Sequence, residues 1–296
     1  GTKEHQKHIL NILNKIGLTE DNLLCPPDTP LDKNEQEFLI KNSLPARKIH
    51  NNCSGKHSAM LALCLDKGFD ISTYNNINNP LSKLVIEQIC NLCEVNPENI
   101  IVSKDGCTLP TVATTLPELC HGFLNLFLSE KYQKLTNSIL LNPYLAGGRE
   151  RIDSEIINAG QGNLISKVGA EGIIVVVNLK HEEALCVKIA DSNYLARSLV
   201  IIKSMLNLDW LTIEQVLNSP LKDLYETNIK TETGEIVGEV GRKLIAFGFN
   251  LFLAPYDGLP GVPGRSVRAF DGISVASRGH FGEDSVHVVL VTAGLD

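Results

Sequence analysis

A cysteine and a lysine three residues apart mark the segment of this chain best suited to chemistry. Residues 50–57 are His-Asn-Asn-Cys-Ser-Gly-Lys-His, and the apolar run over 58–65 predicts that this loop leads into a buried helix. Because residues three apart lie on one helix face, Cys53 and Lys56 can converge on one point. A lysine ammonium lowers the pKa of a neighbouring thiol and favours the nucleophilic or metal-binding thiolate. The spacing allows, about equally, a plain alternative in which Ser54 caps the helix and Cys53 is an ordinary buried residue.

Further motifs occur in a recognisable order along the chain. They are Asp105-Gly106-Cys107, Asn142–Gly148 followed by Arg151-Ile152-Asp153, Lys167–Gly172, Val187–Asp191 and Gly234–Glu239. Together with residues 50–57 they resemble the asparaginase II family, the Rhizobium-type L-asparaginases. The resemblance runs from Gly1 to about Val240. It implies an amidohydrolase that converts L-asparagine to L-aspartate and ammonia.

The resemblance also implies a catalytic lysine at position 188. Members of the family use two Ser–Lys pairs, and Lys188 matches the lysine of the second pair, which can act as a base when burial or charge lowers its pKa. Neither family serine has a counterpart in this sequence. Lys188 alternates with Val187 and Ile189 along an expected strand, so it points to the opposite face from them. An edge-strand lysine that faces water is the plain alternative.

Amide hydrolysis also needs groups that hold the substrate and its developing oxyanion. Asp105 and Cys107 stand on an expected tight turn and match family residues that line the pocket. Asn52 adds an amide group in the signature loop. The resemblance therefore implies that Asn52, Asp105 and Cys107 bind L-asparagine, and a packed thiol is the alternative for Cys107 alone.

Members of the family can hold a zinc ion between two cysteines and a lysine. Cys53 and Lys56 match the first cysteine and the lysine, so the resemblance implies that both are metal ligands. The second cysteine is expected after the Gly-Ala-Glu-Gly motif, where Val175 stands instead. Cys186 shares a strand face with Lys188 and is a weak substitute. The sequence thus predicts an enzyme that requires no cofactor, with zinc as an optional ligand.

The predicted fold is α+β, similar to the serine β-lactamases and glutaminases, with a helical layer and a mainly antiparallel sheet. Hydrophobic periodicity predicts helices over residues 4–16, 33–42, 56–67, 80–93, 111–128, 129–141, 151–158, 194–206 and 213–217. Short runs of β-favouring residues predict strands over 100–103, 173–177, 184–189 and 235–240. Helices come first and paired strands later, which disfavours an alternating βαβ arrangement.

The composition changes near residue 247 and predicts two parts, an asparaginase II-like domain over 1–246 and a tail over 247–296. No Lys, Asn or Gln occurs after Asn250, whereas Lys and Asn are abundant before it. The change indicates a tail of foreign or variable composition that we expect not to pack on the core, although 285–291 can form a strand. Relative to the family, the first part is expected to lack the N-terminal strands and the Ser-x-x-Lys helix.

Bulk properties exclude several classes of protein. The formal net charge of −7, without a long basic run, gives no support for nucleic-acid binding. No apolar segment approaches the roughly 20 residues that cross a bilayer, so no membrane partner is expected. Eight cysteines in a chain of 296 residues favour reduced thiols and a cytoplasmic protein, with Cys90 and Cys93 packed in one helix. We expect a homodimer with a small-molecule substrate.

Three functions compete for this sequence. The first is an L-asparaginase-like amidohydrolase that, without the family serines, keeps a residual rate enhancement of roughly 10³–10⁴ over water. The second is a non-catalytic amino-acid-binding fragment or pseudoenzyme that keeps the pocket. The third is a penicillin-recognising-type serine hydrolase, for which no Ser-x-x-Lys motif stands at a suitable helix start. Ser54 with Lys56 as its base is a further nucleophile, although a separation of two residues is not the usual helical geometry.

Overall fold

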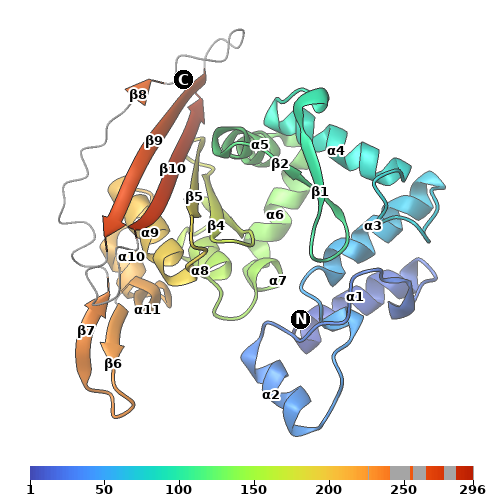
Figure 1. Cartoon of the computed structure of the whole chain (residues 1–296), viewed down its shortest axis with the longest axis horizontal. Coiled ribbons are helices and arrows are strands. Elements are labelled where there is room, and N and C mark those ends of the chain that lie inside the picture. Colours follow the sequence, from blue (N-terminus) through green and yellow to red (C-terminus); the bar gives the residue numbers. More distant parts are fainter. Residues whose placement is uncertain (226, 241–253, 256–264, 277–284, 296) are drawn as a thin grey trace. The chain divides into compact units, whose positions relative to one another are not determined.

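The computed structural model describes residues 1–225, 227–240, 254–255, 265–276 and 285–295. The chain divides into two compact units, Gly1–Thr114 and Thr115–Asp296 (Figure 1). Both units combine helices with antiparallel strands, so the predicted α+β class is confirmed. The finer likeness to serine β-lactamases and glutaminases stays a prediction, as does the division of the chain after residue 246.

Helices and one β-hairpin build the first unit. In chain order they are α1 (Lys3–Lys15), η1 (Glu20–Asn22), α2 (Lys33–Lys41), η2 (Lys48–His50), α3 (Ser54–Lys67), α4 (Pro80–Cys93), η3 (Pro97–Asn99), β1 (Ile101–Lys104) and β2 (Pro110–Ala113). Local signals set several ends. Asn79 caps α4 through its side chain, Pro80 opens that helix, and Gly68 ends α3 in the left-handed conformation. All four predicted helices of this unit are present, within two residues of the predicted bounds.

An apolar core ties the helices of this unit to the hairpin loop. Its buried members are Ile9, Leu13, Leu23, Cys25, Ile49, Leu61, Cys64, Tyr74, Leu81, Cys107 and Leu109. Cys107 and Leu109 belong to the loop between β1 and β2, whereas the residues of β1 itself are exposed. The hairpin is therefore anchored to the core through the buried residues of its loop, whereas β1 lies at the surface.

The second unit is built around a six-stranded sheet (Figure 1). Its elements are α5 (Leu116–Leu128), η4 (Glu130–Tyr132), α6 (Gln133–Leu141), α7 (Pro143–Gly147), α8 (Ile152–Ala159), β3 (Leu164–Val168), β4 (Ile173–Asn178), β5 (Glu183–Ile189), α9 (Tyr194–Asn207), α10 (Ile213–Leu217), α11 (Leu221–Tyr225), β6 (Thr227–Lys230), β7 (Ile236–Val240), β8 (Ala254–Pro255), β9 (Arg265–Ala276) and β10 (Ser285–Leu295). The strand order is β3-β4-β5-β10-β9-β8, and neighbouring strands are antiparallel. A separate hairpin pairs β6 with β7.

Apolar side chains cover both faces of the sheet at strands β3, β4 and β5. On one face, Ile174 and Val176 of β4 join the buried side chains of α8 and α9. On the other face, Val175 and Val177 join those of α5. Successive strand residues point to opposite faces, so burial on both sides explains why β4 is a continuous run of Ile and Val.

The single helix predicted over 111–128 is wrong at its start. The first residues of this stretch form strand β2, and the helix α5 follows. Thr111 and Val112 are β-branched, which favours a strand, and a capping box between Thr115 and Glu118 sets the helix start. β3, β6, α7 and α11 are not predicted, because each has five residues or fewer and shows little periodicity. The 12-residue strand β9 is not predicted either.

The expectation that the tail would not pack on the core is wrong for strand β10. Its backbone pairs with β5 in an antiparallel register that sets Val289 opposite Lys188. The run over 285–291 is rich in Val, which favours strands, and β5 without it would have an open edge. The pairing makes β5 an internal strand, so Lys188 is not an edge-strand residue. The foreign or variable composition of 247–296 stays a prediction.

All eight cysteines are reduced thiols in the structure. Cys90 and Cys93 are both buried on α4, which confirms that they pack within one helix. Within the described part of the chain, no helix combines the length and the apolar character needed to cross a bilayer.

A methyl group at position 160 should destabilise the second unit. A Cβ built on Gly160 would lie 2.5 Å from Cβ and 2.6 Å from Cγ of Leu164, a buried residue of β3. We expect Gly160→Ala to lower the free energy of unfolding by about 1–3 kcal/mol, as overpacked cores do. Urea denaturation followed through Trp210, the single tryptophan, measures this. Gly55→Ala is the control, because a Cβ there meets nothing within 4 Å; equal losses in both variants would contradict the prediction.

Candidate functional site

Buried hydrogen bonds fix the loop that begins α3. The buried Asn51 side chain accepts a hydrogen bond from Cys53 N at 2.9 Å and donates one to Pro26 O at 3.1 Å. The buried Ser54 hydroxyl donates to Ile49 O at 3.0 Å. Cys53 is therefore held as the residue that precedes the first turn of α3, and Ser54 is the first residue of the helix rather than its cap.

The loop of the β1–β2 hairpin supplies Asp105 and Cys107. Asp105 N donates to Leu109 O and Thr108 N donates to Asp105 O, both at 2.8 Å, so the loop is tight. Thr108 has a φ of +81°, a conformation that strains a β-branched residue. Its hydroxyl donates to Leu24 O at 3.0 Å, which helps to hold it there. Strained backbone of this kind clusters at functional loops.

Four of the predicted site residues converge where α3 meets this loop. Lys56 Nζ lies 3.1 Å from Asp105 Oδ2, and the Cys107 thiol donates to the same oxygen at 3.2 Å. The possible ligand atoms of Cys53, Asp105 and Cys107 all lie within 4.8 Å of one another. We call Cys53, Lys56, Asp105 and Cys107 the thiol–carboxylate cluster. Asn52 is exposed beside it, and the roles assigned to all five residues stay predictions.

Burial, rather than the lysine charge, dominates the pKa of Cys53. Desolvation raises the pKa of this thiol to about 11, although the Lys56 ammonium lowers it. The charge of Lys56 therefore acts on the thiol as its spacing predicts, but burial has the larger effect, and the thiol is protonated at neutral pH. Asp105 differs, because hydrogen bonds from Lys56 and Cys107 outweigh burial and leave the pKa of its carboxyl below the usual value.

The same contacts keep Lys56 charged. Burial lowers its pKa, but Cys53 and the Asp105 carboxylate raise it more, so the pKa of Lys56 ends above its usual value. The side chains of Lys56 and Asp105 are nevertheless 41% and 39% exposed. A ligand from solution can therefore reach both charges.

His57 anchors the cluster from the core side. Its Nδ1 lies 2.6 Å from the hydroxyl oxygen of Tyr74, which also accepts a hydrogen bond from Leu24 N at 2.8 Å. Both rings are fully buried. Burial, helped by the charge of Lys56, lowers the pKa of His57 to about 4, so this histidine is neutral at pH 7.

The donors of the thiol–carboxylate cluster fit a zinc ion. Zinc prefers sulfur, nitrogen and oxygen ligands in a tetrahedral arrangement, and two thiols and a carboxylate converge here. The family resemblance predicts the second cysteine at the position of Val175, which is buried on the α5 side of the sheet in the second unit. The structure instead places Cys107 beside Cys53. The sequence signal for this second thiol is the tight turn that carries both Asp105 and Cys107.

Lys188 belongs to the second unit, and its place relative to the thiol–carboxylate cluster stays a prediction. Its ammonium donates to the carbonyl oxygens of Glu171 and Ile189. As expected, its neighbours Val187 and Ile189 are buried on the α9 side of the sheet. Cys186 is buried against α5 in the second unit and does not belong to the thiol–carboxylate cluster.

The structure weakens two serine-based alternatives. Ser54 is buried and donates its hydroxyl to a backbone carbonyl, so it is not poised for attack with Lys56 as its base. A Ser-x-x-Lys spacing occurs at residues 219–222. Ser219 precedes the short helix α11 and donates its hydroxyl to Val216 O at 3.0 Å. Neither serine matches the exposed nucleophile that a penicillin-recognising hydrolase needs.

The chain matches the family model described as L-asparaginase II over residues 1–241, well over half of its length. No curated protein matches the chain. The matched range contains the whole thiol–carboxylate cluster as well as Lys188.

The buried His57 should make stability fall as the pH falls below neutral. Its pKa is about 4 in the folded chain and near 6.5 in the unfolded chain, so the unfolded state binds the proton first. Between pH 7 and pH 5 we expect the free energy of opening of α3 to fall by about 2 kcal/mol. Amide hydrogen exchange of α3 measures this. His57→Asn should remove the dependence and His8→Asn, at an exposed position, should keep it; equal pH slopes would contradict the assignment.

Proposed function

The chain belongs to the L-asparaginase II family, and we propose that it is an amidohydrolase that converts L-asparagine to L-aspartate and ammonia. The observation that carries the proposal is the solvent-accessible ion pair between Lys56 and Asp105, which lies beside two thiols. An α-amino acid carries one positive and one negative group a short distance apart. The ion pair offers the two complementary charges in one place.

Binding of the substrate would exchange one ion pair for two. The Asp105 carboxylate would accept hydrogen bonds from the α-ammonium group of L-asparagine, and Lys56 would donate to its α-carboxylate. Both side chains are partly exposed, so this exchange needs no unfolding of the loop. Asn52, exposed beside the cluster, would add an amide that can pair with the substrate side chain.

Hydrolysis of the amide then needs a nucleophile and a base. The hydroxyls of Ser54 and Thr108 donate to backbone carbonyls, which argues for slow rather than fast attack from this loop. The family resemblance assigns the base to Lys188 of the second unit, whose ammonium donates to the carbonyl oxygens of Glu171 and Ile189.

Zinc is part of the proposal as an optional ligand. Cys53, Cys107 and Asp105 would hold the ion, and when bound it would polarise the amide carbonyl as a Lewis acid. The thiols must lose their protons to bind it, and burial raises the pKa of Cys53 to about 11. Lys56 could bind as an amine only after losing the charge that Asp105 stabilises, so Asp105 is the more natural third ligand.

Asp105→Asn should weaken the binding of L-asparagine about tenfold, because an amide cannot pair with the substrate ammonium group. Lys56→Met should weaken it similarly through the α-carboxylate. Isothermal titration calorimetry with L-asparagine measures binding separately from turnover. Lys83→Met, an exposed lysine of α4, is the matched control and should bind as the parent chain does. Undiminished binding by Asp105→Asn would refute the assigned substrate site.

Ammonia release from L-asparagine tests the reaction in the same proteins. We expect a turnover number below about 1 s⁻¹, the low end of the ordinary enzyme range. Lys188→Met should abolish release without weakening binding if Lys188 is the base, and Lys167→Met, at an exposed lysine of β3, is the matched control. Binding with no ammonia release at all would favour the non-catalytic amino-acid-binding protein. Turnover well above this limit would contradict the expected slow reaction.

Cys107→Ser should lower the affinity for zinc at least about tenfold, because it removes one of two thiolate ligands. Competition with a chromogenic chelator measures this affinity. Cys53→Ser should have the same effect, and Cys90→Ser, a buried thiol of α4, should have none. Affinity should also rise with pH, since the raised pKa of Cys53 must be overcome. Equal affinities in the Cys107→Ser and Cys90→Ser proteins would refute the metal site.

A further inference from the structure

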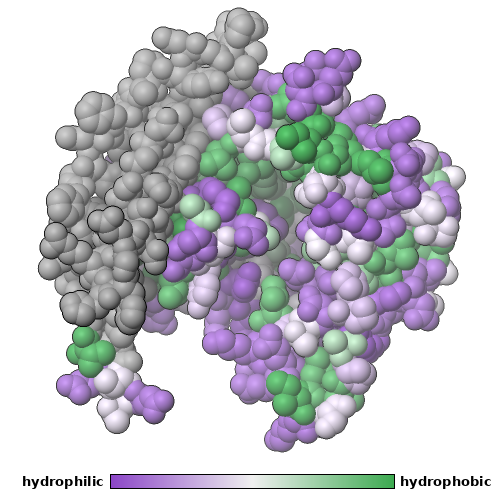
Figure 2. Space-filling view, viewed as in Figure 1, coloured by the Kyte–Doolittle hydropathy of each residue, from purple (hydrophilic) through white to green (hydrophobic). Residues whose placement is uncertain are grey.

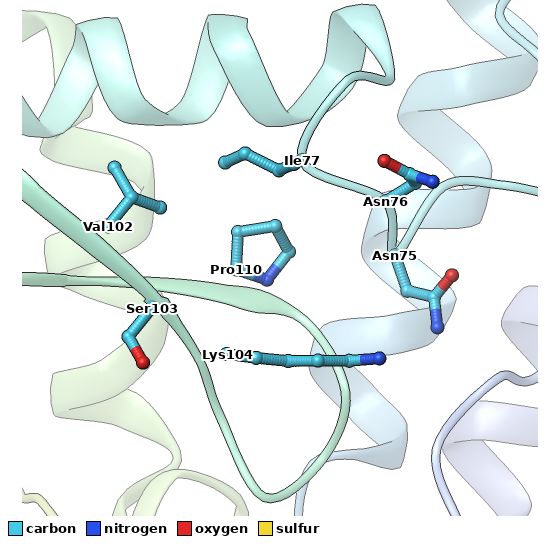
Figure 3. Close-up of a pocket in the computed structure, with 7 residues that line it drawn as sticks. All are labelled: Asn75, Asn76, Ile77, Val102, Ser103, Lys104 and Pro110. Atoms are coloured by element: carbon cyan, nitrogen blue, oxygen red, sulfur yellow. The ribbon is translucent and has the colours of Figure 1, made fainter.

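A cavity of about 360 Å³ lies in the first unit between residues 75–77 and the β1–β2 hairpin (Figure 3). Residues 102–104 and Pro110 of the hairpin complete its lining. Its volume is at the low end of the roughly 300–1,000 Å³ found for small-ligand sites. No member of the thiol–carboxylate cluster lines it, so the cavity is not part of the site described above.

One side of this cavity is apolar. Ile77, Val102 and Pro110 face one another across it in Figure 3. Ile77 and Val102 are exposed although both are large apolar residues. Figure 2 shows that hydrophobic patches on this face of the molecule lie among hydrophilic ones. An apolar ligand group that covers these side chains would remove them from water, which favours binding.

The other side carries one positive charge and an amide donor. The Lys104 side chain extends toward Asn75 in Figure 3, and its ammonium makes no hydrogen bond or ion pair with any residue that the structure describes. Its chain neighbour Asp105 pairs with a different lysine. Asn76 uses its Oδ1 to accept a hydrogen bond from Asn78 N at 2.9 Å, which leaves its NH₂ group as a donor.

We propose that this cavity binds a small organic monocarboxylate with a branched apolar tail. The carboxylate would accept hydrogen bonds from Lys104 and Asn76, and the tail would pack on Ile77, Val102 and Pro110. One lysine and neutral amide groups match a single negative charge, whereas a phosphate dianion would keep an uncompensated charge.

The cavity adjoins the loop that carries the candidate active-site residues. Lys104 immediately precedes Asp105, and Asn75 donates to Thr108 Oγ1 at 3.0 Å. A ligand that orders Lys104 and Asn75 therefore acts on both ends of the loop without entering the thiol–carboxylate cluster. We expect its binding to alter the surroundings of residues 105–108 while leaving L-asparagine free to bind.

Titration of the full chain with isovalerate tests the proposal, with backbone amide NMR shifts as the readout. We expect saturable shifts at Ile77, Val102 and Lys104. Isovaleramide, the neutral isostere, should bind about fivefold more weakly, because it lacks the charge that pairs with the exposed lysine. The Lys104→Met protein should bind isovalerate about fivefold more weakly than the parent chain. The Lys83→Met protein, in which the changed residue does not line the cavity, should bind it with unchanged affinity.

Three outcomes would overturn the proposal. They are shifts that map outside the cavity, equal affinities for isovalerate and isovaleramide, and equal affinities of the Lys104→Met and Lys83→Met proteins. Val102→Asp gives a second variant, because a carboxylate placed beside Lys104 should satisfy its charge and abolish binding. Calorimetry with L-asparagine at saturating isovalerate separates this site from the proposed active site. Competition between the two ligands would refute a separate site and leave the proposed function standing.

Discussion

The buried hydrogen bond between His57 and Tyr74 is the contact on which the geometry of the candidate site depends. Tyr74 also accepts from the backbone N–H of Leu24, and Thr108 donates to the carbonyl of the same residue. One peptide segment therefore links helix α3 to the hairpin loop. Leaving a buried polar group unpaired costs about 1–3 kcal/mol, so α3, residue 24 and the loop are held in one arrangement. The approach of Cys53 to Cys107 follows from that arrangement.

Burial and hydrogen bonding act in opposite directions within a few ångströms. Desolvation keeps Cys53 and His57 neutral, whereas hydrogen bonds keep Asp105 charged although it is partly buried. At neutral pH the cluster is one ion pair beside the neutral Cys53 thiol. A site with balanced charge suits a zwitterion, and it becomes a strong metal site only when protons leave. Binding of a zwitterionic substrate thus uses the charged Lys56 and Asp105, whereas metal binding also requires the thiols to lose their protons.

Sequence reasoning succeeds where the signal is local. The helices α1, α4 and α10 follow from periodicity and from end signals such as Pro80, and the spacing of Cys53 and Lys56 marks the start of α3. It fails where a boundary lies inside an apolar run, as at Thr115. It also fails where geometry depends on distant contacts, since Lys56 and Asp105 are 49 residues apart. The competition between burial and charge at Cys53 could not be judged before the burial was known.

The placement of β10 has a consequence for the order of events during protein synthesis. Strands β3, β4 and β5 leave the ribosome well before β10, which pairs with β5 across about a hundred residues of chain. Until then the hydrogen-bonding edge of β5 is open, and the nascent sheet can pair with other chains. The first unit needs no such delayed partner, because its core uses residues 9–109 alone. Translation thus exposes a folded helical unit followed by an unfinished sheet, and the latter is where chaperone binding should concentrate.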